Sequence, residues 1–178
     1  MDFELITVKK EIILLSYIAA VTLFIIYTIA IYTDCKWLKI FNWLTFPSVI
    51  IGWGLMLIQF GLLSSFKFLL MMLCAGLSLE IIKIWKPGDT RLMLSGCIWT
   101  TLFLGMNNAV VGFGIIIFTL IIYILAGHVV WLKTCNWSFI TYFKQLTFRT
   151  THREVIGRMP GAWTIAGGNL IYIFVLNL

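Results

Sequence analysis

The sequence predicts an all-α polytopic membrane protein with about six transmembrane helices in one bundle, and two observations carry this prediction. The first is composition, because 61% of the 178 residues are hydrophobic and only 11% are charged, whereas soluble domains carry about a quarter charged residues. The second is the length of the uncharged runs, which cover residues 12–33, 40–66 and 92–132. About 20 apolar residues cross a bilayer as a helix. The runs lack the apolar–polar alternation of outer-membrane strands, so helices are expected.

The boundaries of the six predicted spans follow from charged residues, one turn and one proline. Charged residues mark the ends of the first and third spans, and Gly52 and Gly54 in the second permit close helix contact. The run of residues 92–132 is long enough for two spans, and the turn-like sequence at 105–108 divides it. Pro160 opens the last span. The predicted spans are residues 12–32, 44–63, 66–85, 92–106, 110–132 and 160–178.

The segment of residues 133–159 is predicted to be an amphipathic cytoplasmic loop within a single membrane-embedded domain, residues 1–178. Its aromatic and aliphatic side chains interleave with Lys144, Arg149 and Arg153. This pattern favours a helix that lies in the membrane interface. A surface that grips a substrate is the alternative.

The distribution of cations predicts the orientation of the spans. If the N-terminus lies outside, ten of the 13 lysine and arginine residues fall on cytoplasmic segments. This bias follows the positive-inside rule, and we expect a multi-pass protein of the plasma (inner) membrane. The bias and anionic lipid account for the net charge of +6, so no nucleic-acid partner is expected.

Two aspartates are the candidate functional residues, because ionisable side chains near hydrocarbon are expensive and usually functional. Asp34 closes the first predicted span and Asp89 opens the fourth, so both are expected at the cytoplasmic membrane face. If these two spans are neighbours, the carboxylates come within about 3–6 Å of each other. Such a pair can share a proton and activate a water. The structural alternatives are a solvated loop residue for Asp34 and a helix N-cap for Asp89.

Three segments of the chain together resemble a known family. Residues 34–45 and 86–92 contain the two aspartates, and residues 159–168 begin the last predicted span. In this order, and with spans between them, they resemble the motifs of the type IV prepilin peptidases and preflagellin peptidases, which are membrane aspartic peptidases. The resemblance covers most of the chain.

Within these motifs, the substitutions leave both aspartates in place. Phe41 stands where the family has a proline. Lys86 and Arg91 stand where it has a glycine and a lysine. With these differences the chain is either an ordinary pilin processor or a divergent member of the family with its own client.

The resemblance implies an aspartic endopeptidase with Asp34 and Asp89 as the catalytic pair. The residues that it marks as supporting the motif or the substrate are Asn42, Gly88, Arg91 and Pro160. The implied partner is a pilin-like membrane protein whose short basic leader is removed at the cytoplasmic face. No cofactor and no metal are expected. The chain lacks the family's long cytoplasmic loop with cysteine pairs, and it therefore resembles the short, peptidase-only kind.

The sequence fits other intramembrane proteases less well, and one other class of protein is an alternative. The chain contains no His-Glu-x-x-His and no Gly-x-Ser-Gly, so zinc and rhomboid-type serine proteases do not fit. Its four cysteines form no C-x-x-C, which excludes a zinc ribbon. The alternative of a different class is a non-catalytic membrane assembly or transport subunit built on the same scaffold.

Overall fold

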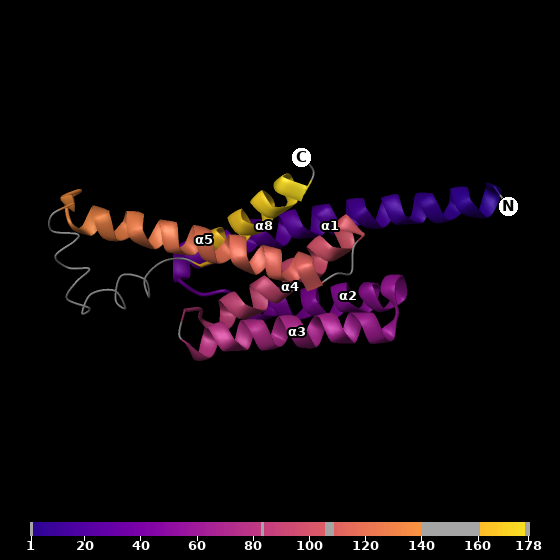
Figure 1. Ribbon diagram of the computed structural model, residues 1–178, viewed down its shortest axis with the longest axis horizontal. Coiled ribbons are helices and arrows are strands. Elements are labelled where there is room, and N and C mark those ends of the chain that lie inside the picture. Colours follow the sequence, from indigo (N-terminus) through magenta and orange to yellow (C-terminus); the bar gives the residue numbers. More distant parts are fainter. Residues whose placement is uncertain (1, 83, 106–108, 140–160, 177–178) are drawn as a thin grey trace.

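The computed structural model describes residues 2–82, 84–105, 109–139 and 161–176 as a bundle of helices, and these residues contain no strand. Figure 1 shows the N-terminal part of α1 and the C-terminal part of α5 projecting past the other helices at opposite ends of the bundle. The described helices are α1 (Asp2–Trp37), α2 (Asn42–Phe60), α3 (Leu62–Ile81), α4 (Pro87–Leu104), α5 (Ala109–Thr134) and α8 (Ala162–Leu176).

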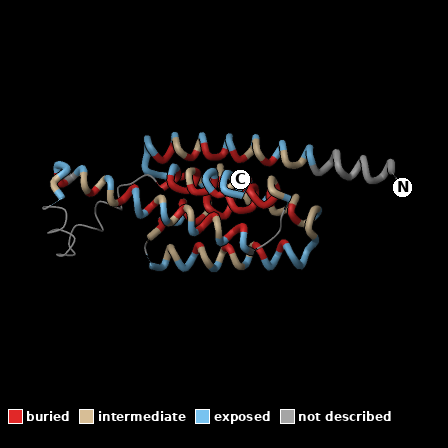
Figure 2. Tube along the Cα trace, turned by 45° about the horizontal axis from the view of Figure 1, so that its top comes forward, coloured by how far each residue is buried: buried red, intermediate tan, exposed pale blue. Residues whose placement is uncertain are grey.

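Helix α4 is the centre of this bundle. It contacts each of the other five described helices. From Asp89 to Leu102 every residue except Arg91 is buried, and Figure 2 shows the buried positions gathered along the middle of the molecule. Because α4 is enclosed by protein on all sides, its sequence can hold small and polar residues where an outer helix would need apolar ones.

The outer helices present apolar side chains outward. Ile58, Ile81 and Phe24 are 84%, 78% and 73% exposed, which suits hydrocarbon and not water. Four described helices, α1, α2, α3 and α5, are long and apolar enough to cross a membrane. Helix α8 is apolar but has 15 residues, and α4 begins with a charged turn. The α-helical fold is therefore confirmed, whereas six crossings remain a prediction.

Two helix boundaries differ from the sequence prediction in a way that matters for the aspartates. Helix α1 extends to Trp37 instead of residue 32, so Asp34 lies in the last turn of the helix and not in a loop. Helix α4 begins at Pro87 instead of residue 92. Proline favours the first position of a helix because it has no N–H to leave unpaired. Asp89 is consequently the third residue of α4, and the expected N-cap position belongs to Lys86.

The close contact expected in the second span occurs at one of its two glycines. A Cβ atom placed on Gly52 would lie 3.1 Å from Nε1 of Trp99 on α4, whereas one on Gly54 would meet open space. The same indole N–H donates to Oγ of Ser48 at 2.9 Å. Helices α2 and α4 are therefore joined by a small-residue contact and a buried hydrogen bond. Gly54 has no such role.

Helices α1, α4 and α8 are joined in the core by uncharged polar side chains. Thr100 donates to Oδ1 of Asn169 at 2.7 Å, and Nδ2 of Asn169 donates to the Tyr27 hydroxyl. Gly96 makes room for this contact, because a Cβ there would lie 2.6 Å from Nδ2 of Asn169. We call Tyr27, Thr100 and Asn169 the neutral level. All three are buried.

Candidate active site

Asp34 links the end of α1 to the beginning of α8. Helix α1 stops where the Leu38 N–H donates to the Asp34 carbonyl at 2.8 Å, with Leu38 at a φ of 50°. The C-terminus of α1 disfavours a negative charge on the Asp34 side chain. The carboxylate turns instead toward α8, where the Ala162 N–H donates to Oδ2 at 2.8 Å. The positive end of α8 thereby stabilises the anion.

Asp89 reaches the same turn from the first turn of α4. Its Oδ2 accepts a hydrogen bond from the Lys86 N–H at 3.0 Å, which is the acidic half of a capping box. The other oxygen, Oδ1, lies against Gly161, because a Cβ placed there would collide with Oδ1 and lie 2.7 Å from Cγ. Gly161 therefore allows a contact that any side chain at this position would block.

The two aspartates thus meet at one dipeptide, Gly161-Ala162, which consists of the residue before α8 and the first residue of α8. Asp34 hydrogen-bonds the second residue of the pair and Asp89 packs on the first. Asp34 is 3% exposed and Asp89 is 6% exposed. We call Asp34, Asp89, Gly161 and Ala162 the carboxylate level. The sequence allowed two purely structural roles, a solvated loop residue for Asp34 and a helix cap for Asp89. Asp34 is instead buried in a helix, and Asp89 caps α4 with only part of its carboxylate.

The electrostatics of Asp89 show that the carboxylates interact. The pKa of Asp89 is raised from 3.8 to about 6, mainly because burial disfavours the charged form. The hydrogen bond from the Lys86 N–H lowers the pKa, the charge of Asp34 raises it, and the Lys86 ammonium lowers it. A carboxyl group with this pKa exchanges its proton close to neutral pH, as a general acid or base requires.

Tyr123 of α5 is a further buried side chain, and it is 7% exposed. The charges of Asp34 and Asp89 both act on its hydroxyl group, although burial is the larger influence. A single tyrosine within an apolar run is typical of a packed span, so the sequence contained no signal that would set it apart.

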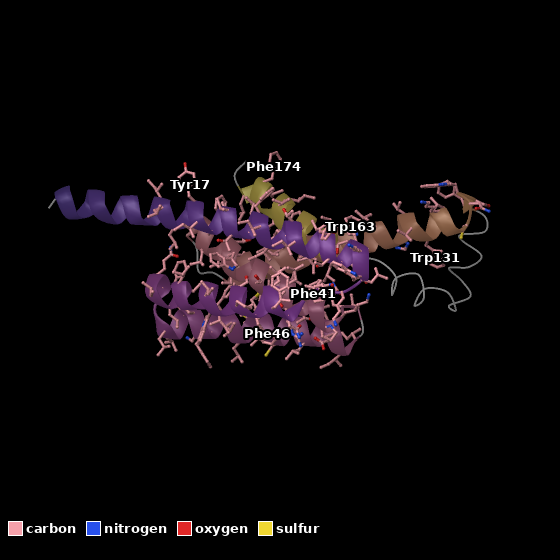
Figure 3. All side chains as sticks on the ribbon, turned by 180° about the vertical axis from the view of Figure 1, so that it is seen from behind. Tyr17, Phe41, Phe46, Trp131, Trp163 and Phe174 are labelled. Carbon is pink, nitrogen blue, oxygen red and sulfur yellow. The ribbon has the colours of Figure 1, made fainter. Side chains whose placement is uncertain are left out.

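The supporting residues of the two motifs join the motifs to each other. A Cβ on Gly88 would lie 3.2 Å from Cβ of Ile40, so the start of α4 packs directly on the segment between α1 and α2. Arg91 donates to Oδ1 of Asn42, and its guanidinium lies 5.2 Å from the ring centre of Phe46, which is labelled in Figure 3. Asn42, Gly88 and Arg91 therefore hold the first two motifs together, and their described contacts do not include a carboxylate.

The third motif contributes through its backbone. Pro160, together with residues 140–159 of the expected amphipathic loop, lies outside the described residues, and Gly161 follows it directly. Sequence reasoning placed Gly161 and Ala162 in the last motif and gave them no role. Their role depends on the direction from which α1 and α4 approach, which a linear pattern does not contain.

No metal site accompanies the carboxylates in the part of the chain that the structure describes. No group of three or more His, Cys, Asp or Glu side chains there could hold a metal ion. The chain matches no family model, no curated protein and no solved structure.

Proposed function

We propose that this protein is a membrane aspartic endopeptidase that removes the short basic leader of pilin-like small membrane proteins. The observation that carries the proposal is the meeting of Asp34 and Asp89, buried and electrostatically coupled, at the first residues of α8. Two interacting carboxyl groups, one charged and one protonated, supply the general base and the general acid that peptide hydrolysis without a metal requires.

The geometry favours a division of labour between the two carboxyl groups. Asp34 accepts the Ala162 N–H at the positive end of α8, so it is the charged partner and the general base. Asp89, whose pKa is raised to about 6, holds a proton more readily than an ordinary aspartate and is the general acid in its protonated form. Asp34 takes a proton from water while the water oxygen attacks the scissile carbonyl carbon. Asp89 gives its proton to the carbonyl oxygen, which forms a neutral diol.

Collapse of the diol then breaks the peptide bond and restores the pair. The C–N bond cleaves as the leaving nitrogen takes the proton held by Asp34, and a diol hydroxyl returns its proton to Asp89. The products are a leader with a new carboxyl terminus and a shortened protein with a free amine.

The position of the site favours a substrate that lies in the membrane. The carboxylates lie where α1, a helix able to span a membrane, ends. A bond just before an apolar substrate helix would reach this height if that helix lay beside the bundle. We further propose six crossings with α4 enclosed, and a cytoplasmic site in the plasma membrane, as the ten-to-three distribution of cations indicates.

The test is cleavage of a defined substrate by carboxylate variants. The substrate is a peptide with a short basic leader that ends in glycine and precedes an apolar helix, co-expressed with the full chain. We expect wild type to release the leader and both Asp34→Asn and Asp89→Asn to leave it uncut, because the two groups act as a unit. The masses of the substrate fragments provide the readout.

The matched control is Glu80→Gln, which neutralises a carboxylate near the end of α3 that is not part of the carboxylate level. This variant should cleave as wild type does, and gel filtration should show that all variants fold. Substantial cleavage by either aspartate variant would favour the non-catalytic assembly or transport subunit. An uncut leader with the folded wild type would exclude this class of substrate.

A further inference from the structure

Aromatic rings and lysines form a continuous surface where α1 ends and α2 begins. The rings contact in series, with centre-to-centre distances of 5.9 Å from Tyr32 to Trp37, 5.7 Å from Trp37 to Phe41 and 6.4 Å from Phe41 to Trp43. Figure 3 labels Phe41 near the end of α1. We call this the cation–aromatic surface. It consists of Tyr32, Lys36, Trp37, Lys39, Phe41 and Trp43.

The two lysines of this surface lie over rings and not beside acids. The Lys36 ammonium is 4.7 Å from the ring centre of Trp37 and donates to the Tyr32 hydroxyl at 3.4 Å. The Lys39 ammonium is 5.7 Å from the ring centre of Phe41. Among the described residues neither lysine pairs with a carboxylate. Asp34, the nearest acid in sequence, is turned inward to Ala162. The surface therefore carries two positive charges and no counter-ion of its own.

The rings are exposed even though they are large and apolar. Tyr32, Trp37 and Trp43 are 59%, 51% and 63% exposed. The surface lies at the junction of two helices that are able to span a membrane. Tyrosine and tryptophan at such ends favour the boundary between hydrocarbon and headgroups, and unpaired lysines at the same height attract phosphate.

We propose that the cation–aromatic surface binds the headgroup of an anionic phospholipid. The two ammonium groups contact the phosphate, and the ring faces contact the glycerol and the first methylenes of the acyl chains. A protein or nucleic-acid partner fits less well, because the same rings continue onto the apolar outer faces of α1 and α2. This binding is independent of the proposed peptidase activity, although it would fix the height of Asp34 in the membrane.

The test measures lipid binding to the purified full-length protein in detergent at low salt. Phosphatidylglycerol and phosphatidylcholine are titrated separately, and bound lipid is counted by native mass spectrometry. We expect Lys36→Gln with Lys39→Gln to weaken phosphatidylglycerol binding roughly 30-fold, since each basic residue near a membrane surface contributes several-fold. Phosphatidylcholine binding should remain unchanged.

Two control variants distinguish a localised lipid-binding site from a non-specific effect of positive charge on the protein. Lys67→Gln removes an exposed cation near the start of α3, at the end of the bundle away from the α1–α2 junction (Figure 1), and it should bind phosphatidylglycerol as wild type does. Lys36→Arg with Lys39→Arg keeps both charges and should also retain binding. If the double glutamine variant does not fold, Lys36→Gln alone provides the second test, and it should weaken phosphatidylglycerol binding about fivefold.

Three results would overturn the proposal. One is equal phosphatidylglycerol binding by wild type and the folded glutamine variant, and another is an equal loss in Lys67→Gln. The third is displacement of phosphatidylglycerol by millimolar inorganic phosphate, which would indicate a site for free phosphate and not for a lipid.

Discussion

Helices α1, α4 and α8 meet at two buried polar levels that differ in charge. At the neutral level, Asn169 accepts from Thr100 and donates to Tyr27. At the carboxylate level, two acids meet at Gly161-Ala162. On α1 and α8 the residues of the two levels are seven positions apart, or about two turns: Tyr27 and Asp34 on α1, and Asn169 and Ala162 on α8. On α4, Gly96, which makes room for the neutral level, is also seven positions from Asp89.

The two levels contribute differently to the stability of the folded state. The neutral level pairs uncharged groups, so it favours the folded state and specifies how the helices pack. The carboxylate level buries acids close together, which raises the pKa of Asp89 and opposes folding whenever Asp89 is charged. Asparagine could accept the same two backbone N–H groups without this penalty. The presence of carboxylates at these two positions therefore supports the proposed catalytic role.

The largest expected difference between the two levels is in catalysis. We expect Asp89→Asn to lower the cleavage rate of the basic-leader substrate by about 10³-fold or more, since a paired acid and base act together. Asn169→Leu should change the rate of the folded fraction by less than about tenfold, because it removes no reacting group. Single-turnover cleavage at equal concentrations of folded protein measures both. Equal losses in the two variants would erase the distinction.

The next largest effect is on stability. Here the change at the neutral level should have the larger effect, and the change at the carboxylate level the smaller one. Asn169→Leu leaves the hydroxyls of Thr100 and Tyr27 without their buried partner, and it should lower the free energy of unfolding by about 2–4 kcal/mol. Asp89→Asn should not destabilise the protein at pH 8, because it removes a buried charge while keeping an acceptor for the Lys86 N–H. Thermal unfolding in detergent compares the variants. A strongly destabilised Asp89→Asn would make the carboxylate level structural.

The pH dependence of stability follows from the raised pKa of Asp89. Below pH 3.8 the group is protonated in the folded and the unfolded state, so the folded state bears no penalty. Between pH 3.8 and about 6 the unfolded state loses this proton first, and stability falls by roughly 3 kcal/mol. Wild type should therefore lose stability relative to Asp89→Asn across this range. If the stability of the two proteins changed with pH in the same way, the titration of Asp89 would not contribute to stability as described.

The smallest effect is expected at the contact between the first two motifs. Arg91→Gln loses the hydrogen bond to Asn42 and the stacking on Phe46, which together should cost about 1 kcal/mol because the contact is exposed. Asn42→Ala should cost a similar amount, and the double variant should cost less than the sum. Additive losses in unfolding experiments would show that the two residues act separately.

Much of the fold could be predicted from the sequence, because apolar runs report lipid-facing helices directly. The limits appear at α4 and α8. Helix α4 is enclosed, so its polar residues reduced its apparent length and hid its first turn. The meeting of Asp34 and Asp89 at one end of the bundle could be predicted from their positions at span ends. The role of Gly161 could not be foreseen, because it depends on packing between segments far apart in the chain.

The coupling of the two carboxyl groups is tested most directly by titrating Asp89. The chain has three aspartates, at positions 2, 34 and 89, so carboxyl-labelled aspartate gives few infrared bands, and Asp89→Asn assigns the band of interest. We predict a midpoint near pH 6 in wild type. In Asp34→Asn the midpoint should fall but stay above 3.8, because a neighbouring charge is lost while burial persists. An identical midpoint in wild type and Asp34→Asn would show that the carboxyl groups do not interact and would contradict a catalytic pair.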